Sequence, residues 1–395
     1  MSTKPKSVLV IGGGIAGLTA ARELARQNIR VELVEKADFL GGHAIQYACK
    51  ATDECLQCGA CKVEKTLKEV VETPGINVHL ATEIKTITRN GRFSIQLEKT
   101  DVDKADGLKA CQKGYDENPV QCSVLRGYSK HNAKYYGADG RLIPETTGQD
   151  QQLEADAVIL ASGFAPFDAT RKSTYRYGDL ANVITGLDLE RIKRARGNLV
   201  RPSDGQAPNK IAFIQCVGSR DERLGNLWCS QVCCPYALRT AMSLKHKNPD
   251  LDITIFYMDI QNTGNNFATF YQQCHDGMKF VRTIPVDMYQ VEGDRIQTRF
   301  MTETDGSPVN EEFDMVVLSV GIMPGKDNQA MAEALDIPLN SDGFASGANA
   351  LDTTATVQDG IFLAGTVQGP KTIANTMAHA GQSAGNVVAY LRRAS

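Results

Sequence analysis

The cysteines are the residues whose spacing points most directly to chemistry. The 395-residue chain contains eleven of them, and eight fall into two groups. The first group is Cys49, Cys55, Cys58 and Cys61, and the second is Cys216, Cys229, Cys233 and Cys234. No secretory signal precedes the first apolar run, so we expect a cytoplasmic protein whose thiols stay reduced. Grouped cysteines in such a compartment indicate metal binding or redox chemistry.

The second group has a spacing that favours a cluster of several metal ions. Cys216 and Cys229 stand apart, whereas Cys233 and Cys234 are adjacent in the chain. A cluster with several irons accepts adjacent ligands more readily than one tetrahedral zinc ion does. We therefore predict a [4Fe–4S] cluster here, with a structural zinc ion or a buried redox pair as the alternatives.

The first group ends in the CxxCxxC spacing that is found in ferredoxin-type sites. Its last three cysteines would supply three ligands, and the fourth is open between Cys49 and a distant residue such as Cys111 or Cys122. Zinc held by sulfur alone is the alternative. The two groups together predict one [4Fe–4S] cluster, or two.

A glycine-rich turn near the N-terminus predicts a dinucleotide site. The residues that match GxGxxG are Gly12, Gly14, Ile15, Ala16 and Gly17. A buried-strand pattern precedes this turn, a helical pattern follows it, and Glu35 ends the next strand, where a carboxylate can bind ribose hydroxyls. Glycine here permits the tight turn, the approach of a pyrophosphate to the helix N-terminus, and close helix–strand packing.

The elements that must position these residues follow from the apolar periodicity. A parallel α/β unit is expected near the N-terminus and a second one at 210–321, with an antiparallel hairpin that turns at Asn90-Gly91 between them. The expected elements are strand 7–11, helix 15–26, strand 31–35, hairpin 83–96, strand 157–161, strand 210–214, helix 236–247, strand 253–258, strand 315–321, strand 361–365 and helix 372–392. The polar stretch 100–150 is expected to be an excursion between antiparallel strands.

Charge and hydropathy exclude two classes of partner. The 43 basic and 46 acidic side chains give a formal net charge of -3 and are mixed along the chain. No basic block is present that could bind a phosphate backbone, so nucleic acid is not an expected partner. No run approaches the ~20 apolar residues that a membrane helix needs, so direct membrane insertion is not expected either.

Further motifs resemble those of two-dinucleotide-binding-domain flavoproteins, in which a FAD-binding Rossmann-type domain carries an inserted second α/β domain. The resemblance rests on the continuation after Glu35 and on two later glycine turns. It implies that FAD contacts Lys36, Gly42, His43, Ser162, Gly163, Gly365, Thr366, Lys371 and Thr372. In most members of that family an aspartate binds the ribityl chain where this sequence has Thr366, so that contact departs from the family pattern. Lys371 would stabilise a reduced flavin anion, although a solvated lysine fits the sequence equally well. For His43, and for His379 in the C-terminal helix, a packed or capping histidine is the preferred interpretation.

Four longer motifs make the resemblance more specific. They are Gln215-Cys216-Val217-Gly218-Ser219-Arg220-Asp221, Cys229-Ser230-Gln231-Val232-Cys233-Cys234, Phe256-Tyr257-Met258-Asp259-Ile260 and Ala364-Gly365-Thr366-Val367-Gln368-Gly369-Pro370-Lys371. With these the chain resembles the flavin-containing A subunit of heterodisulfide reductases and its shorter relative in the quinone-interacting membrane-bound oxidoreductase of sulfate reducers. The complete CxxCxxCxxxCP runs of the longer subunits are missing, which favours the shorter type.

That resemblance implies an electron-transfer subunit with FAD and iron–sulfur clusters, peripheral to the inner membrane and active within its complex. Its partners would be other flavin and iron–sulfur subunits, a membrane subunit that reacts with menaquinol, and adenylylsulfate reductase in sulfate respiration. The alternatives are a heterodisulfide reductase-type, electron-bifurcating subunit, an NAD(P)H-dependent disulfide reductase, and a scaffold with a structural flavin. A nicotinamide cofactor is disfavoured because the loop at Cys216 lacks a second GxGxxG. We expect a discontinuous FAD domain at 1–200 and 325–395, including the first cysteine group, and an inserted domain at 207–324.

Overall fold

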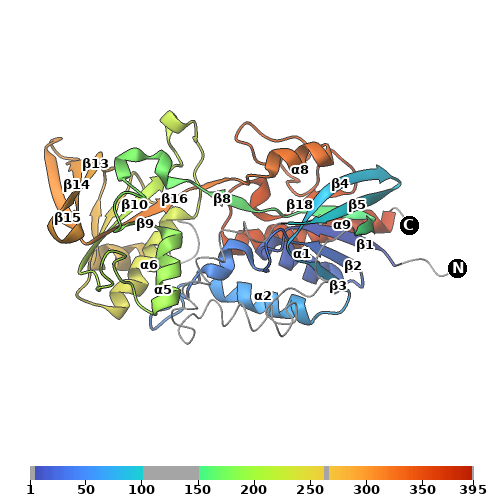
Figure 1. The fold of residues 1–395 in the computed structure, drawn as a ribbon, viewed down its shortest axis with the longest axis horizontal. Helices are drawn as coiled ribbons and strands as arrows, with labels where there is room; N and C mark the ends of the chain where they lie inside the picture. The colour runs from blue at the N-terminus through green and yellow to red at the C-terminus, as the bar shows by residue number, and fades with distance from the viewer. Residues whose placement is uncertain (1–4, 101–150, 262–266, 394–395) are drawn as a thin grey trace. The chain divides into compact units, whose positions relative to one another are not determined.

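The computed structural model describes residues 5–100, 151–261 and 267–393. The chain packs into two compact units, each coloured by position along the chain in Figure 1. Unit 1 comprises Met1–Gln46, Gly59–Ala165 and Pro324–Ser395, and unit 2 comprises Tyr47–Cys58 and Pro166–Met323. The expected excursion at 100–150, with Cys111 and Cys122, lies almost entirely outside the described residues.

Unit 1 is built on a parallel sheet with the strand order β18-β7-β1-β2-β3. Its strands are β1 (Ser7–Ile11), β2 (Arg30–Val34), β3 (Ile76–His79), β7 (Ala157–Leu160) and β18 (Ile361–Leu363). The three adjacent strands β18, β7 and β1 are buried at every position, because a sheet that is covered on both faces buries its central strands. The strands expected from the sequence are confirmed within a few residues.

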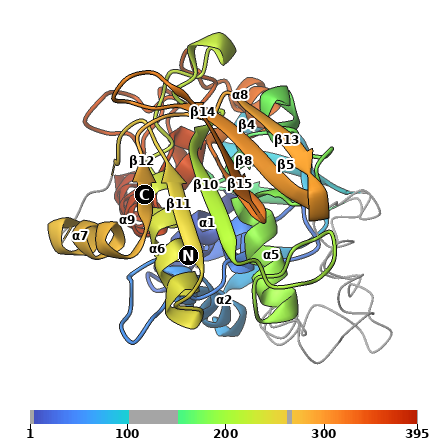
Figure 2. The same cartoon turned by 90° about the vertical axis from the view of Figure 1, so that its left-hand side faces the viewer.

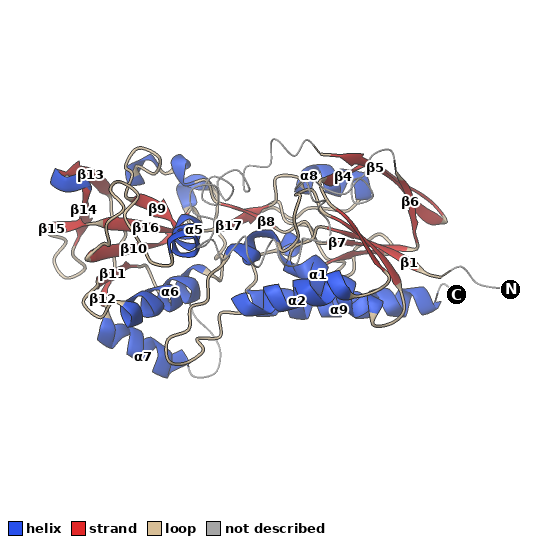
Figure 3. Cartoon of the chain, turned by 60° about the horizontal axis from the view of Figure 1, so that its bottom comes forward, coloured by secondary structure: helices blue, strands red, loops and turns tan. Residues whose placement is uncertain are grey.

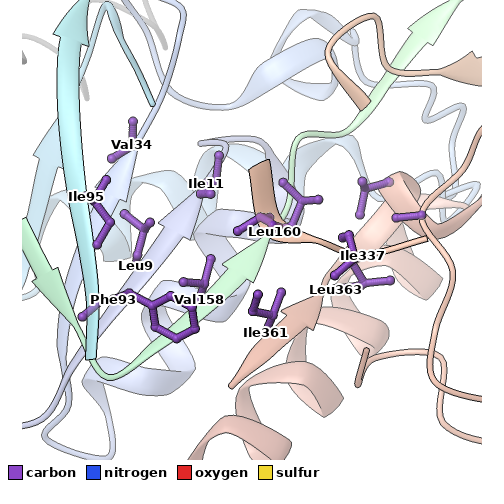
Figure 4. Close-up of a cluster of buried hydrophobic side chains, with 14 of the residues drawn as sticks. Leu9, Ile11, Val34, Phe93, Ile95, Val158, Leu160, Ile337, Ile361 and Leu363 are labelled. Atoms are coloured by element: carbon purple, nitrogen blue, oxygen red, sulfur yellow. The ribbon is translucent and has the colours of Figure 1, made fainter. Parts of the chain in front are cut away.

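Two different layers cover this sheet. Helices α1 (Ile15–Ala25), α2 (Ala60–Glu72) and α9 (Ile373–Arg393) lie together along one face, as Figure 3 shows. The other face packs against an antiparallel sheet of β4 (Thr82–Asn90), β5 (Arg92–Lys99) and β6 (Gln152–Ala155). Figure 4 shows the core between the sheets, where Leu9 and Val158 meet Phe93 and Ile95. The two layers cover the faces of the sheet and not the carboxyl ends of its strands, where α/β proteins of this kind bind their ligands.

The hairpin between β4 and β5 turns more tightly than the sequence suggested. Asn90 pairs with Arg92, and only Gly91, with φ 73°, has a left-handed backbone conformation. Asn90 and Gly91 were expected to have positive φ angles together. The difference follows from the pairing register, which extends both strands until a single glycine connects them.

Unit 2 has its own parallel sheet, in the order β12-β11-β10-β16-β9. Its strands are β9 (Val183–Thr185), β10 (Lys210–Val217), β11 (Asp252–Phe256), β12 (Lys279–Val281) and β16 (Met315–Val320). The helices of this unit are α5 (Gly186–Arg196), α6 (Cys233–Lys247) and α7 (Phe267–Gly277), and an antiparallel sheet adds β13 (Asp287–Val291), β14 (Arg295–Met301) and β15 (Pro308–Phe313). Figure 2 shows β10, β11 and β12 side by side, near α6 and α7.

The bounds of the two units differ from those expected. Strand β9 was placed in the first domain, yet it pairs with β16 of the second parallel sheet. Residues 47–58, also placed in the first domain, pack with unit 2. Short strands β8 (Phe164–Pro166) and β17 (Ile322–Pro324) pair with each other, and helix α8 (Asn328–Leu335) follows in unit 1.

No helix within the described ranges combines the length and the apolar character that crossing a bilayer requires.

Candidate functional site

The GxGxxG turn of unit 1 has two glycines that are required for packing and one that faces open space. Gly12 has φ 107°, and a Cβ there would lie 2.4 Å from the carbonyl oxygen of Ala161. A Cβ on Gly17 would lie 1.8 Å from the carbonyl oxygen of Gly12. Around Gly14, by contrast, a Cβ would meet no described atom within 4 Å. Gly12 and Gly17 are therefore packed against backbone atoms, whereas Gly14 leaves open space beside the buried helix residues Ile15 and Ala16. A pyrophosphate needs such space to approach the helix N-terminus.

Glu35 lies beside this turn, immediately after β2. Its carboxylate accepts the backbone N–H of Gly13 at 2.6 Å and that of Ala37 at 2.7 Å, one on each oxygen. Burial raises the pKa of the Glu35 carboxyl, and the two backbone donors oppose that rise. Each oxygen keeps a lone pair for a further donor. The group is thus held in place and can still accept hydrogen bonds from ribose hydroxyls.

A second glycine pair packs against the first turn. The N–H of Gly41 donates to the carbonyl oxygen of Gly13 at 2.8 Å. A Cβ on Gly42, which has φ 56°, would lie 3.1 Å from the Cα of Gly14. His43 follows in the short 3-10 helix Gly42–Gln46, and its Nε2 lies 3.2 Å from the carbonyl oxygen of Phe164. These contacts bring the expected residues 41–43 to the carboxyl edge of the sheet.

The glycine turn after β18 reaches the same helix N-terminus. Gly365 has φ 78°, and a Cβ there would lie 2.6 Å from the Cβ of Ala16. Its N–H donates to Nδ1 of His379 at 2.9 Å, and the Nε2 of that ring lies 3.1 Å from the Oγ1 of Thr353. Burial lowers the pKa of His379 to about 4, so the ring is neutral with its proton on Nε2. The sequence predicted a packed or capping histidine here but not its partner Gly365, because no motif links two residues that are fourteen positions apart.

The remaining residues that were expected to contact FAD lie in unit 1 and differ in their burial and in their hydrogen-bond partners. Gly163 follows β7 with φ 81°, and the Oγ of Ser162 lies 3.5 Å from the Oδ1 of Asn328. Lys36 forms surface ion pairs with Asp327 and Glu83. The other three residues follow β18. Thr366 is buried, Thr372 caps α9 by accepting the N–H of Asn375 at 3.2 Å, and Lys371 donates to Gln368, with its pKa lowered to about 8 by burial.

The second cysteine group lies where β10 ends and α6 begins. Cys216 falls at an irregularity of β10, between Ile214 and Val217, and has φ 58°, which is strained for a residue with a side chain. Cys233 and Cys234 are the first two residues of α6 and are buried. Helix α6 begins at Cys233, although the sequence suggested a start near Tyr236. Both thiols therefore lie at a helix N-terminus, which stabilises negative charge.

The four sulfurs of this group are close enough to interact electrostatically. Burial first, and then the neighbouring Cys234 and Cys229, raise the pKa of Cys216 to about 12. Burial and the other three cysteines raise the pKa of Cys233 as well. Within the described parts of the chain, no three His, Cys, Asp or Glu side chains are arranged to hold a single metal ion. Four thiols that act on one another at a strand end and a helix N-terminus suit a cluster, because the ligands of a cluster bind different irons.

Two polar contacts shape this loop. The backbone N–H of Gln231, which has φ 60°, lies 3.3 Å from the Sγ of Cys229. Arg220 forms a two-pronged ion pair with Asp259, the residue that stands where a ribose carboxylate would be in a second dinucleotide domain. The guanidinium of Arg220 lowers the pKa of the Asp259 carboxyl. This carboxylate is already paired within the protein.

The first cysteine group divides between the two units. Cys49, Cys55 and Cys58 lie in the segment Tyr47–Cys58 of unit 2, and Cys61 is the second residue of α2 in unit 1. The Sγ of Cys55 lies 3.4 Å from the backbone N–H of Gln57, which has φ 53°. This is the same arrangement as at Cys229 and Gln231. The repeated turn aims a backbone donor at a sulfur, as thiolate ligands require.

A buried ion pair fixes this segment to unit 2. Lys50 donates to Glu190 of α5, and both side chains are almost wholly buried. The other oxygen of Glu190 accepts the N–H of Ala48 at 2.8 Å. Arg239 of α6 donates from its Nε to the carbonyl oxygen of Leu56 at 2.6 Å. Lys50, Glu190 and Arg239 were not predicted from the sequence, because a pair 140 positions apart leaves no local pattern.

A family model and two solved structures agree on the fold of this chain. The family model described as an NAD(P)-binding Rossmann-like domain matches residues 10–60. The fold resembles thioredoxin reductase from Lactococcus lactis, with a TM-score of 0.59, 15% identity and coverage of 98% of this chain and 99% of that one. Thioredoxin reductase from T. acidophilum gives a TM-score of 0.56 at 15% identity, covering 99% and 100% of the two chains. The chain thus has the two-dinucleotide-binding-domain flavoprotein fold that the sequence predicted.

The sequence itself is more similar to another group. It is 31% identical over 413 residues to the A subunit of the H(2):CoB-CoM heterodisulfide,ferredoxin reductase of Methanothermobacter thermautotrophicus, covering 95% of this chain and 62% of that protein. It is 34% identical over 423 residues to the iron-sulfur A subunit of the CoB–CoM heterodisulfide reductase of Methanocaldococcus jannaschii, covering 97% and 64%. The chain therefore spans less than two thirds of the length of these relatives. Identity of this extent across nearly the whole chain, on the flavoprotein fold, makes it a member of the family of heterodisulfide reductase A subunits.

Proposed function

We propose that this protein is an oxidoreductase subunit that binds FAD in unit 1 and at least one [4Fe–4S] cluster through Cys216, Cys229, Cys233 and Cys234. The observation that carries the proposal is the replacement of a second nucleotide loop by four neighbouring cysteines at the carboxyl edge of the second parallel sheet. FAD, when bound, exchanges electrons singly or in pairs, and an iron–sulfur cluster exchanges them singly. The chain's own residues bind and orient these groups.

The residues of unit 1 fit FAD. The open backbone at Gly14 and the N-terminus of α1 would bind the pyrophosphate, and Glu35 would bind the ribose. Gly365, fixed by the neutral ring of His379, provides a third glycine turn beside the same helix. Lys371 would place a cation near the flavin, where it would stabilise a reduced, anionic form.

The residues of unit 2 fit a cluster better than a nicotinamide nucleotide. Cys216 stands in the loop where a nucleotide site would have glycine, and Asp259 is engaged by Arg220. Cys233 and Cys234 occupy the helix N-terminus at which a phosphate would otherwise bind. These three features speak against the alternative of an NAD(P)H-dependent disulfide reductase.

The proposed physiological role is electron transfer within a complex. The resemblance to the quinone-interacting type favours a relay between menaquinol and adenylylsulfate reductase, in the cytoplasm and peripheral to the membrane. Other flavin and iron–sulfur subunits and a membrane quinone-reactive subunit would be its partners. The names of its relatives support the alternative of a subunit that acts in a heterodisulfide reductase complex.

The FAD site is tested by a pair of glycine substitutions. Gly14→Ala adds a methyl group where the protein has open space, so the FAD-free variant should melt at the same temperature as FAD-free wild type and should fail to bind FAD. Gly277→Ala, at the end of α7, is the control, because a Cβ there also meets no described atom within 4 Å and its backbone is not left-handed, and it should keep its FAD. Full FAD content in Gly14→Ala would contradict the assigned pyrophosphate site.

The electron-transfer role is tested by anaerobic reduction. Dithionite should bleach the flavin absorbance and produce the EPR signal of a reduced cluster in the purified chain. A menaquinol analogue should do the same only when the partner subunits are present. A flavin that stays oxidised in the quinol-treated complex would instead support a scaffold role.

A further inference from the structure

A buried amide and a buried hydroxyl lie unpaired beside the second cysteine group. Gln215 is 1% exposed and Ser319 is 2% exposed. Neither Nε2 nor Oε1 of Gln215, nor the Oγ of Ser319, has a hydrogen-bond partner among the described residues. Burying a polar group without a hydrogen-bond partner destabilises the folded protein. Such atoms at a candidate site indicate that something else binds there.

Gln215 and Ser319 lie where the two central strands of the second sheet end. Along β10, Ile211 and Phe213 pack in the core with α6 residues, and Gln215 and Cys216 form the irregularity that follows Ile214. Along β16, Met315 and Val317 pack in the same core, and Ser319 continues this alternation. The two strands are neighbours, with Ile214 opposite Leu318 and Val217 opposite Val320, so Gln215 and Cys216 together oppose Ser319. Gln215 and Ser319 are therefore adjacent at the carboxyl ends of the two strands.

The cysteines of α6 reach the same edge. The Sγ of Cys233 lies 3.8 Å from the carbonyl oxygen of Val320, the residue after Ser319. Cys216 follows Gln215 directly and is among the groups that act on the pKa of Cys233. Gln215 and Ser319 are therefore each followed in the chain by a residue of the cysteine site. Cys216 follows Gln215 on β10, and Val320 follows Ser319 on β16.

We propose that Gln215 and Ser319 are positioning residues that donate hydrogen bonds to the sulfurs of the cluster bound by the second cysteine group. The proposal rests on the proposed function, because it requires that cluster. Hydrogen bonds to its sulfurs stabilise the more negative, reduced state and raise the reduction potential. The two side chains would therefore set the potential at which this cluster accepts an electron.

The experiment uses Gln215→Met, which keeps the length of the side chain and removes both polar groups, and Ser319→Ala. The control is Ser243→Ala, which removes another buried hydroxyl without a partner among the described residues. Ser243 lies ten residues along α6 from Cys233, or about 15 Å at the rise of a helix. Each protein is titrated anaerobically with the EPR signal of the reduced cluster as the readout, and iron, acid-labile sulfide and melting temperature are measured alongside.

The expected result is a lower potential in Gln215→Met at unchanged iron and sulfide. At a fixed applied potential, the ratio of reduced to oxidised cluster should fall about tenfold, which is 59 mV for one electron. Ser319→Ala should shift it in the same direction by less, and Ser243→Ala should leave it unchanged. Loaded variants that keep the wild-type potential would overturn the proposal and leave a buried water as the partner of Gln215.

The experiment distinguishes the absence of the cluster from the absence of hydrogen bonds to it. If wild-type protein contains no iron or sulfide, the proposed function itself is wrong. If the wild type is loaded and Gln215→Met loses its cluster or unfolds, the potential of Ser319→Ala decides. An unchanged reduction potential in Ser319→Ala overturns the proposed role of Ser319, and with it the proposal that Gln215 and Ser319 both donate hydrogen bonds to the cluster.

Discussion

The two cysteine-bearing parts of unit 2 are held in different ways. Cys233 and Cys234 are buried in the first turn of a helix, and Cys216 extends from a central strand. Cys49 and Cys55 are exposed in a loop that an ion pair and a few backbone hydrogen bonds attach to α5 and α6. Regular structure fixes ligand positions more firmly than loops do. The second group is therefore a preformed site, and the first depends on its attachment.

The two parts also share one feature. Cys55 and Cys229 are each followed, two residues later, by a glutamine with positive φ whose N–H points at the cysteine sulfur. Positive φ is uncommon for residues other than glycine, and it costs energy. Its recurrence at both places supports a thiolate role for both groups, despite their different attachment.

The largest effect is expected for Cys233→Ala. It removes a ligand from the preformed site, so that cluster should be lost, with roughly half of the iron if two clusters are present. Cys274→Ala is the control, because Cys274 is also buried but lies on α7, outside both groups. Iron and sulfide analysis gives the result. Equal iron in both variants would show that the second group holds no cluster.

Glu190→Gln should detach the first group and spare the second. The change leaves the ammonium of Lys50 buried without a counter-charge, which costs about 3–5 kcal/mol. Denaturant unfolding would measure this loss, and the EPR signal of the second cluster should remain. Asp179→Ala, the control, breaks an exposed pair with Arg176 and should cost less than about 1 kcal/mol.

A second substitution sharpens this result. Adding Lys50→Met to Glu190→Gln removes the uncompensated charge, while the glutamine can still accept the N–H of Ala48. Most of the lost stability should return. If the double variant is no more stable than the single one, the cost of Glu190→Gln does not arise from the buried charge.

Thiol labelling compares the two groups directly. In protein freed of metal under native conditions, Cys49 and Cys55 should react with N-ethylmaleimide more than about tenfold faster than Cys233, because burial hinders both ionisation and access. Mass spectrometry of timed digests would give the rates. Similar rates would mean that the second group is not preformed without its metal.

The smallest effect is expected at the ion pair of the second group. Asp259→Asn breaks a half-exposed pair with Arg220 and should cost less than about 1 kcal/mol. Because Arg220 lowers the pKa of Asp259, this contribution is present above the unfolded carboxyl pKa of ~3.9 and is lost as the pH falls further. The difference between the unfolding free energies of the two proteins should therefore be present at pH 7 and vanish at lower pH.

Local patterns were sufficient to predict most of the strands and helices that carry the candidate sites. The apolar run Ser7–Ile11 and the glycine turn after it define a βαβ unit, because strand, turn and helix lie within thirty residues. Helix α6 begins three residues before the expected start, and its first turn includes Pro235, which is tolerated there because its missing N–H would have no intrahelical partner.

What could not be predicted depends on contacts between distant positions. Nothing near Lys50 in the sequence indicates that Glu190 will bury it, and nothing near β9 indicates that it will pair with β16 rather than join the first sheet. The role of His379 as an acceptor for Gly365 is of the same kind. These contacts arise from tertiary packing, which local periodicity does not encode.

The most direct test of the central claim is the composition of anaerobically purified protein. Iron, acid-labile sulfide, zinc and FAD should be measured on one sample. We predict one FAD per chain, iron and sulfide in equal amounts at about four to eight per chain, and no stoichiometric zinc. Zinc without sulfide would contradict the account and leave a flavoprotein whose cysteines hold structural metal.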